Sequence, residues 1–526
     1  MRCVCLLFLV LALSACALSQ TVRRIAIVGG GPAGAASAYF ARHELQQLGQ
    51  AADIHVFEQH LRTGGRAHIG SVKHANRTLY FEQGASMFIG KNLHMMDFAR
   101  QYNLTLCAHP CTLHPEDTQE AENDMVVDAS MLGAYGIWDP LPGPVSGAGR
   151  WMVRQHGDQP LRDMLRALWR YQGLGDLRTV RKLTRESVDQ FMQSYEQFAD
   201  PHKGIYASWD AYLADRPALQ QSLYYHAAEL YSHGASRISP RFLREVVSLA
   251  TRVNYMQDVD RINALGAHIS MAAESDEAYS VAGGNYQVFD RMLTDSADVH
   301  LGREVMAIER NGTGYRVVTN NGVEEGMFDT VIIAAPLPLT KLRLPEGLEY
   351  VAGAVEAAYV RMHVTFVIGT LRSDLFPADG LRLPRLVVTP FGTTVPFNCL
   401  SFLACLDGAQ QCGRPGSLAL FKLFSHAPID LPRVFSHVQW HRRNTWHAYP
   451  RLEPRNGNMY AGGSGDDPSA FHLPRKPLPP IVLERMDNAG LFYVNGMETM
   501  FSTMESQTVA ARHVARLALF GDKSLV

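Results

Sequence analysis

A glycine-rich segment near the N-terminus has the spacing of a turn that binds a dinucleotide. Gly29, Gly31 and Gly34 fit the pattern G-x-G-x-x-G, and Glu58 follows 24 residues after the last of them. In this pattern the first glycine allows a tight turn, the second lets the backbone approach a pyrophosphate, and the third lets helix and strand pack closely. A carboxylate at about this separation binds ribose hydroxyls. These residues therefore predict a dinucleotide site.

The sequence around these glycines has the order that the motif requires. Residues 24–28 are a short apolar run rich in β-branched side chains, which is typical of a buried parallel strand. Residues 35–48 are rich in alanine and predict a helix, and residues 54–58 predict a second strand. Together they form a β-α-β unit of about 30 residues, and amide groups at the start of its helix would face the anion. A glycine turn with only a structural role would not need this context.

A second glycine pair decides between NAD and FAD. Gly64, Gly65 and Arg66 lie just beyond the second strand. Backbone amides and one guanidinium suit a diphosphate, whereas the alternative is a β-turn with a surface arginine. The stretch from Glu58 to Arg66 resembles FAD-dependent amine-oxidase-like and isoprenoid-desaturase-like enzymes. The resemblance implies that the cofactor is FAD, with Gly65 and Arg66 at its diphosphate.

The same resemblance assigns two later segments to the cofactor site. In such enzymes the segment matched by residues 81–86, which contains Gly84, brings backbone against the flavin. Residues 490–498 predict a strand that ends near Gly496 and Glu498, before a final helix over about residues 506–519. This last turn would touch the ribityl chain and the isoalloxazine, and the helix N-terminus would stabilise negative charge on reduced flavin. The alternative is an ordinary strand-to-helix turn.

Further blocks resemble the prenylcysteine oxidase (prenylcysteine lyase) family. They are residues 252–257 (RVNYMQ), 260–264 (DRINA), 281–285 (VAGGN) and 446–450 (WHAYP), with shorter matches at residues 92–95 and 334–337. The matches extend over about residues 24–515. Ala282 stands where the family usually has Glu, and Arg261 resembles an insertion. Residues 107–150 and 383–415 do not align with the family pattern, so the resemblance leaves the exact substrate open.

The family resemblance implies both a fold and an activity. The implied fold is α/β, with an FAD-binding Rossmann-like domain (amine-oxidase/GDI-like) and an interleaved α+β substrate domain. The implied reaction converts a farnesyl- or geranylgeranyl-cysteine, O2 and water into cysteine, a prenyl aldehyde and hydrogen peroxide. The C–H bond beside sulfur is also allylic, so loss of a hydride to the flavin leaves a cation that both neighbours stabilise. The protein must then mainly orient this bond and hold a lipophilic small molecule in a dry tunnel.

The most distinctive block supplies the candidate catalytic residues. Asn254, Tyr255 and Gln257 are expected near the flavin or the substrate cysteine. The alternative is a hydrogen-bonded structural turn, since buried polar groups must be paired in any case. His94 is a candidate proton relay, although a lone histidine more often has a structural role.

Residues outside that block are candidates for the walls of the site. Gly283 and Gly284 would permit a close backbone approach to FAD, or form only a turn. Trp446 and Tyr449 would line an apolar pocket, with core packing as the equal alternative.

Composition gives no support to nucleic-acid binding and predicts a globular chain. Lys and Arg number 49 against 51 Asp and Glu, a net charge of −2, which does not support nucleic-acid binding through a basic field. Hydrophobic residues make up 47% of the chain, enough for a large core.

We predict FAD-binding segments over residues 20–106, 251–340 and 481–526, a mainly helical substrate segment over 107–250 and a sheet-rich one over 341–480.

The first 19 residues have the pattern of a secretory signal peptide. Arg2 precedes an apolar run over residues 4–13 and then small residues, and cleavage is expected after Ala17 or Ser19. The run is too short to span a bilayer, while residues 13–16 also resemble a bacterial lipoprotein box. A secretory route leads to the lysosome, the vacuole or the extracellular space. A lipophilic entrance would allow peripheral membrane contact, and nothing in the sequence sets the oligomeric state.

Cysteines and sequons agree with a secretory route. Removal of the leader leaves five cysteines, an odd number, so at least one is free or forms an intermolecular bond. Cys107 and Cys111 are close enough to pair, and two among Cys399, Cys405 and Cys412 are as well, but spacing fixes neither pair. No zinc-ligand spacing occurs, so no metal site is predicted. N-glycosylation sequons begin at residues 76, 103 and 311.

Two other functions compete with the prenylcysteine reaction. One is a related secreted flavin oxidase for another thioether, amine or isoprenoid metabolite, which the unaligned residues 383–415 motivate. The other is a prenyl-binding escort protein that has lost the cofactor, like GDP-dissociation inhibitors. The intact glycine motifs and Glu58 argue against the escort, because a protein without cofactor does not need them.

Overall fold

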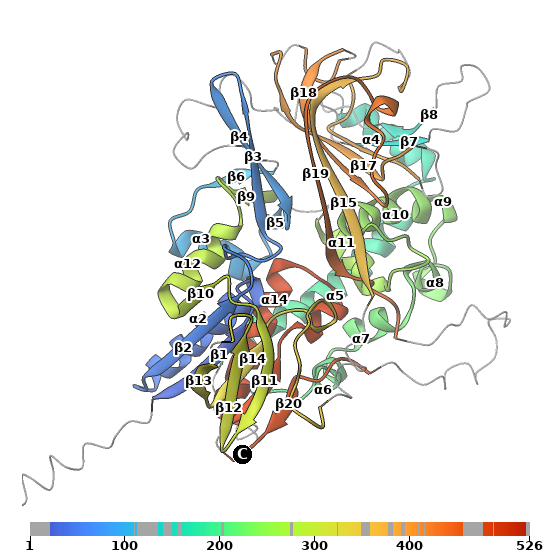
Figure 1. Ribbon diagram of the computed structural model, residues 1–526. Coiled ribbons are helices and arrows are strands. Elements are labelled where there is room, and N and C mark those ends of the chain that lie inside the picture. The colour runs from blue at the N-terminus through green and yellow to red at the C-terminus, as the bar shows by residue number, and fades with distance from the viewer. Residues whose placement is uncertain are drawn as a thin grey trace, which may run out of the picture.

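Figure 1 shows the computed structural model of the chain. The structure describes residues 22–109, 111–112, 135–139, 150–154, 160–200, 203, 205–273, 277–322, 324–348, 358–376, 382–390, 395–408, 411–414, 416–455, 477–487 and 489–521. The predicted leader lies outside these residues.

A six-stranded sheet forms the base of the cofactor region, in the order β10-β2-β1-β14-β21-β20. Its parallel strands are β1 (Arg23–Val28), β2 (Ala52–Glu58), β10 (Asp298–Leu301), β14 (Thr330–Ile333) and β21 (Gly490–Tyr493), and β20 (Val482–Arg485) is antiparallel to β21. The predicted strands at β1 and β2 are confirmed. The strand predicted over residues 490–498 ends at Tyr493, because Asn495–Thr499 turn into the 3-10 helix η6.

Two layers cover this sheet because side chains of β1 alternate between its faces. Ile25 and Ile27 pack with apolar residues of the helices α2 (Pro32–Gln47), α12 (Tyr286–Ser296) and α14 (Met504–Phe520). Ala26 and Val28 pack with the three-stranded sheet of β11 (Val305–Asn311), β12 (Gly314–Thr319) and β13 (Glu324–Phe328). A hairpin turn at Asn311 joins β11 and β12, and the predicted final helix is confirmed. The fold therefore has the predicted Rossmann-like core.

A seven-stranded sheet forms the second region, in the order β19-β15-β18-β17-β16-β7-β8. Its strands are β7 (Tyr135–Asp139), β8 (Arg150–Arg154), β15 (Tyr359–Leu371), β16 (Leu386–Val388), β17 (Cys399–Cys405), β18 (Leu418–Ser425) and β19 (Phe435–Pro450). Strand β16 lies in the segment that does not align with the family pattern, and it pairs with both β17 and β7. The long strands β15 and β19 extend from the level of α14 to the far end of this region (Figure 1).

Helices pack partly on this second sheet and partly on the core around α14. They are α4 (Pro160–Arg170), α5 (Gly175–Ala199), α6 (Trp209–Ala214), α7 (Pro217–Tyr224), α8 (Ala227–Leu230), α9 (Pro240–Phe242), the π-helix η2 (Leu243–Val247), α10 (Ser248–Tyr255) and α11 (Ala264–Ala273). The sequence assigns residues 251–273 to the cofactor domain, yet α10 and α11 share an apolar core with α5 and α8. Among the described residues, no helix is both long enough and apolar enough to cross a bilayer.

A hairpin joins the two regions. It consists of β3 (His68–His74) and β4 (Arg77–Gly84), and its residues Val72, Leu79 and Phe81 pack against Val364 and Phe366 of β15. A small sheet has the order β5-β9-β6, with β5 at Phe88–Ile89, β9 at Ala278–Val281 and β6 at Leu106–Ala108. The helix α3 extends over Leu93–Gln101. Short 3-10 helices lie at Gly234–Ser236, Leu337–Leu339 and Leu431–Arg433. The end of β4 is thereby held between the nucleotide-binding core and the second sheet.

Candidate functional site

One cavity of about 1200 Å³ extends across both regions. Its wall includes the turn between β1 and α2, the end of β4, the end of α10, strands β17, β18 and β19, and the start of α14. Glycine loops line one part of it, and aromatic and aliphatic side chains from the second sheet line another. A nucleotide-binding cradle and an apolar chamber are thus continuous.

The three motif glycines have different surroundings. Gly29 has a φ of +107°, a conformation that glycine adopts without strain. A Cβ on Gly34 would lie 1.8 Å from the carbonyl oxygen of Gly29, so this glycine permits close packing of α2 on β1. A Cβ on Gly31 would meet nothing closer than the Cα of Gly65 at 3.5 Å, and Gly31 lines the cavity. Gly31 is therefore the motif position where a side chain would take ligand space.

Glu58 is buried on the cavity wall at the end of β2. Its Oε2 accepts a hydrogen bond from the Gly30 N–H at 2.8 Å, and its Oε1 accepts one from the His60 N–H at 2.9 Å. Because an ionised carboxylate has about four lone-pair sites, two hydrogen bonds leave capacity for ribose hydroxyls. The backbone donors fix the orientation of the carboxylate.

The second glycine pair packs directly on the first glycine turn. The Gly64 N–H donates to the Gly30 carbonyl at 2.9 Å, and Gly64 and Gly65 have φ values of +87° and +55°. The Arg62 guanidinium donates to the Gly65 carbonyl at 2.9 Å. Gly65 lines the cavity beside Gly31, so the two loops form one continuous backbone surface.

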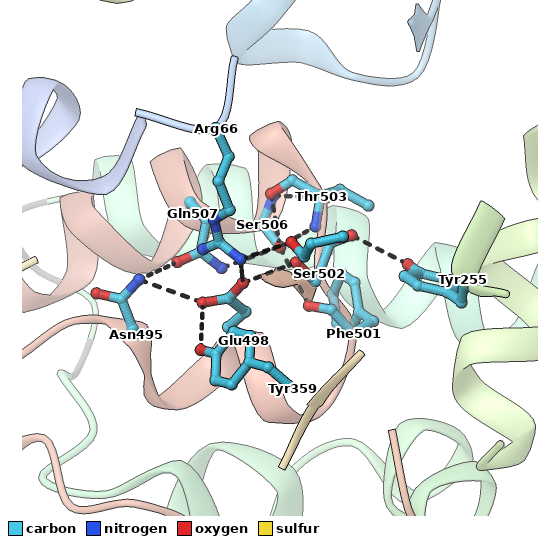
Figure 2. A network of polar contacts seen from close by, with 11 residues as sticks. Arg66, Tyr255, Tyr359, Asn495, Glu498, Phe501, Ser502, Thr503, Ser506 and Gln507 are labelled. Carbon is cyan, nitrogen blue, oxygen red and sulfur yellow. Dashed lines mark hydrogen bonds and ion pairs between the residues drawn. The ribbon is translucent and has the colours of Figure 1, made fainter. Parts of the chain in front are cut away.

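Arg66 has a partner that the sequence did not indicate. Its guanidinium forms an ion pair with the fully buried carboxylate of Glu498 (Figure 2). It also donates to the Ala448 carbonyl at 2.8 Å. Burial alone lowers the pKa of Arg66, but the Glu498 carboxylate outweighs it and raises this pKa above the ordinary value. Arg66 reaches the cavity wall, whereas Glu498 does not. Glu498 thus lies behind the wall, where its carboxylate neutralises Arg66, and its contact with the cofactor stays a prediction.

Other polar groups complete the surroundings of Glu498 (Figure 2). Ser502 Oγ donates to its Oε1 at 2.9 Å, and the Tyr359 hydroxyl and the Asn495 amide donate to its Oε2 at 3.3 and 3.4 Å. The network ties β15, η6 and the entry to α14 together. It also reaches α10, because the Tyr255 hydroxyl donates to the Ser502 carbonyl at 3.2 Å.

The distinctive block around Tyr255 divides into two groups. Asn254 and Tyr255 line the cavity, and the Asn254 amide also donates to the Ala250 carbonyl at 3.1 Å. Gln257 does not line the cavity, and its Oε1 accepts from the Leu452 N–H at 3.1 Å. Asn263 of the same block donates to the Met500 carbonyl at 3.2 Å. The block thus contributes two wall residues and holds the segment that precedes α14.

The second distinctive block acts through its asparagine. Gly283 and Gly284 have φ values of +79° and +115° and form the turn before α12, but neither lines the cavity. Asn285 is fully buried, with its N–H donating to Glu82 Oε1 at 2.6 Å and its amide donating to the Ala85 carbonyl at 2.8 Å. The block therefore positions the end of β4 through Asn285 and a glycine turn, and the direct contact of these glycines with FAD stays a prediction.

His94 lies behind the cavity wall rather than on it. Its Nδ1 forms a hydrogen bond with the Thr508 hydroxyl at 2.9 Å, and burial, with Arg512 nearby, lowers its pKa to about 3. Its backbone N–H donates to Glu505 at 2.7 Å. These contacts dock α3 on α14, so the structural role fits His94 and the proton-relay role does not.

Gly84 and Trp446 meet at the point where the hairpin contacts β19. A Cβ on Gly84 would lie 1.7 Å from the indole ring of Trp446, so only glycine leaves room for this ring. Both residues line the cavity, and the buried Nε1 of Trp446 has no hydrogen-bond partner among the described residues. The same is true of Oδ1 of Asn495, also on the wall. Gly496 does not reach the wall, because it packs against Trp209.

Glu82 and Lys422 are among the buried charged residues on the cavity wall that sequence reasoning missed. Each is 7% exposed. The signal available for Lys422 is a lone lysine within the apolar run of residues 418–424. Glu82 lies in the segment that the sequence assigned to backbone contacts, but nothing local indicates that its side chain is buried.

Four of the five cysteines outside the leader form disulfides. Cys107 bonds to Cys111 and Cys405 to Cys412, while Cys399 is free and buried on the cavity wall. Burial raises the pKa of the Cys399 thiol to about 12, which keeps it protonated. The cysteines therefore have a structural role here.

A histidine pair lies at the edge of the six-stranded sheet. His55 Nδ1 and His300 Nε2 are 2.9 Å apart, and Asp53 Oδ1 lies 3.0 Å from the other nitrogen of His55. His55, His300 and Asp298 would offer three ligand atoms that lie within 4.8 Å of one another. Because the two imidazoles already share a hydrogen bond, a cation would have to displace it, and the cluster lies outside the cavity.

Comparisons with known proteins now bear on the site. The sequence profile of the prenylcysteine lyase family matches residues 155–459 and 470–521, and that of an NAD(P)-binding Rossmann-like domain matches residues 27–102. The chain belongs to the prenylcysteine lyase family. The resemblance seen in the sequence is confirmed.

Relatives in this family match almost the whole chain. The farnesylcysteine lyase of Arabidopsis thaliana is 27% identical over 515 residues, and the prenylcysteine oxidase 1 of Mus musculus is 27% identical over 523 residues. Each alignment covers 94% of this chain and 88% of the relative. A redesigned putrescine oxidase has a similar fold, with a TM-score of 0.50, 13% identity and coverage of 94% of this chain and 98% of that one.

Proposed function

We propose that this chain is an FAD-dependent oxidase that cleaves the thioether of farnesyl- or geranylgeranyl-cysteine. Substrate, O2 and water would yield cysteine, the prenyl aldehyde and hydrogen peroxide. The observation that carries the proposal is the single cavity in which the glycine loops and the apolar chamber are continuous. The names of the relatives, farnesylcysteine lyase and prenylcysteine oxidase, support the same substrate class.

The residues present fit FAD. Gly31 and Gly65 would hold the diphosphate, Glu58 would bind the ribose hydroxyls, and the end of β4 at Gly84 would lie against the flavin. Trp446 Nε1 and Asn495 Oδ1 are buried polar atoms on the wall that lack a hydrogen-bond partner in the described part of the chain, and such atoms call for a ligand. When bound, FAD supplies a two-electron acceptor that O2 reoxidises.

The chamber suits a prenyl chain. Its apolar wall contains Phe402, Leu403, Phe424, Phe501 and Tyr449. These side chains would bind the prenyl group by removing its apolar surface from water, a gain of about 25 cal/mol per Å². They would also exclude water while the substrate C–H bond is held in place. Burial raises the pKa of Tyr255 and of Tyr449 above the ordinary value, so these wall residues remain neutral at pH 7.

The purified protein tests the proposal directly. We expect a yellow protein that, with farnesylcysteine, releases hydrogen peroxide, free thiol and farnesal in equal amounts. Simple amines such as putrescine should release no peroxide. Peroxide from amines alone would contradict the thioether reaction and favour a different oxidase, and a protein that stays colourless after incubation with FAD would contradict the enzyme.

We further propose that the chain enters the secretory pathway and carries N-glycans. The three sequon asparagines, Asn76, Asn103 and Asn311, are all exposed. The protein secreted from eukaryotic cells should gain mobility on a denaturing gel after treatment with peptide N-glycosidase. A variant with all three asparagines replaced by Gln should show no such shift. An untreated secreted protein that already runs at its peptide mass would contradict the proposal.

A further inference from the structure

The cavity wall carries buried charged groups that form no direct ion pair among the described residues. Lys422 Nζ donates to the Glu82 carbonyl at 2.8 Å and to the Ser86 hydroxyl at 2.7 Å, and it lies 5.0 Å from the centre of the Phe424 ring. Among the described residues, no carboxylate forms an ion pair with it. An ammonium group has three donors, so two neutral acceptors leave one donor without a partner.

A second cation faces the same part of the cavity. Arg385 donates to the His109 carbonyl and has no ion-pair partner in the part of the chain that the structure describes. Burial, followed by the positive charges of Arg385 and Lys422, lowers the pKa of His109 to about 3. The neutral His109 thus lies close to both cations, and all three residues line the cavity.

The Glu82 carboxylate, which lies near Lys422, has an unpaired oxygen. Oε1 of Glu82 accepts the Asn285 N–H at 2.6 Å, but its Oε2 is buried and has no hydrogen-bond partner in the described structure. Burial raises the pKa of Glu82 to about 8, and the Asn285 N–H and Lys422 offset part of this effect. Burial lowers the pKa of Lys422 to about 8, and the Glu82 carboxylate offsets part of that effect. Burial of an unpaired charge is costly, so both groups would gain from a ligand that supplies opposite charges.

A zwitterionic amino acid supplies both charges. We infer that this part of the cavity is an amino-acid subsite, in which Lys422 and Arg385 bind the α-carboxylate and Glu82 binds the α-ammonium of a free cysteine thioether. The inference rests on the proposed function for the identity of the thioether. It adds which residues recognise the free amino acid: a methyl ester offers no carboxylate to Lys422 and Arg385, and an N-acylated cysteine offers no ammonium to Glu82.

Paired substrates and variants test the subsite. In Lys422→Met, the KM for farnesylcysteine should rise roughly 10- to 100-fold, the size expected for loss of a charge-assisted hydrogen bond in a dry site. The KM for farnesylcysteine methyl ester should stay within about twofold of the wild-type value. In Glu82→Gln, the KM for farnesylcysteine should rise while that for the N-acetyl derivative should not. Lys182→Met removes an exposed lysine of α5 and should change none of these constants.

A second variant and a binding measurement keep the test decisive. Arg385→Met leaves the contacts of Lys422 intact and should show the same selective loss for farnesylcysteine over its ester. Isothermal titration with S-octylcysteine, which lacks the allylic C–H bond, should give binding that weakens at least about tenfold in Lys422→Met. Equal losses for acid and ester, or unchanged binding of S-octylcysteine, would overturn the subsite. If the wild type binds S-octylcysteine through Lys422 but does not oxidise farnesylcysteine, the subsite stands and the proposed function fails.

Discussion

Gly31→Val should yield a folded protein that does not retain FAD. The position tolerates a Cβ as far as the protein is concerned, because the nearest atom would be the Gly65 Cα at 3.5 Å. The added side chain would instead occupy the cavity surface between the two glycine loops, where the diphosphate must approach the backbone. Flavin occupancy can be measured as the ratio of flavin absorbance at about 450 nm to protein concentration. We expect it to fall to about a tenth of the wild-type value or less.

A matched variant separates loss of the site from loss of the fold. Gly175→Val adds the same side chain at the exposed start of α5, where nothing lies within 4 Å of the new Cβ, and it should keep full flavin content. The melting temperature of Gly31→Val should equal that of wild-type protein stripped of FAD, because only the contribution of ligand binding is lost. Stoichiometric yellow flavin in Gly31→Val would show that the diphosphate lies elsewhere.

The contrast between Gly31 and Lys422 shows which parts of this site the sequence predicts. The glycine turn, Glu58 and the strands around them form one continuous segment, so local spacing specifies both the elements and their chemistry. Lys422 becomes a site residue only because β18 pairs with β15 and β17, and because its Nζ reaches the end of a hairpin some 340 residues earlier. Such long-range contacts leave no periodic pattern in the chain.

The blocks that carry the family resemblance illustrate a related limit. Asn254 and Tyr255 reach the cavity, but Gln257, Asn263 and Asn285 use their side chains to hold backbone. Among their backbone partners Leu452, Met500 and Ala85, only Ala85 lines the cavity, and the other two lie behind it. Distinctive polar residues can therefore indicate that a site is near without contacting its ligand. The fold was easier to predict than the site, because the spacing of apolar residues within a short stretch of sequence indicates buried strands and amphipathic helices.

The Arg66–Glu498 pair gives the second large effect, on stability. Glu498→Gln keeps the size of the side chain but removes the charge that faces the Arg66 guanidinium inside the network of Figure 2. Removal of one partner from a buried ion pair leaves the other charge uncompensated, which typically costs about 3–5 kcal/mol. Because Arg66 keeps about a quarter of its side-chain surface exposed, we expect the lower end, about 3 kcal/mol. Denaturant unfolding of the wild type and the variant measures this difference.

Two further variants identify the origin of the loss. Glu196→Gln removes a carboxylate that pairs with Lys203 on the surface and should leave the unfolding midpoint unchanged, since exposed ion pairs contribute little. The double variant Arg66→Met with Glu498→Leu should be more stable than Glu498→Gln alone, because no uncompensated charge remains. If Glu498→Gln unfolds at the wild-type midpoint, the ion pair does not stabilise the fold and another group compensates the charge of Arg66. The Arg66 guanidinium would then be available for the diphosphate that the glycine loops are predicted to bind.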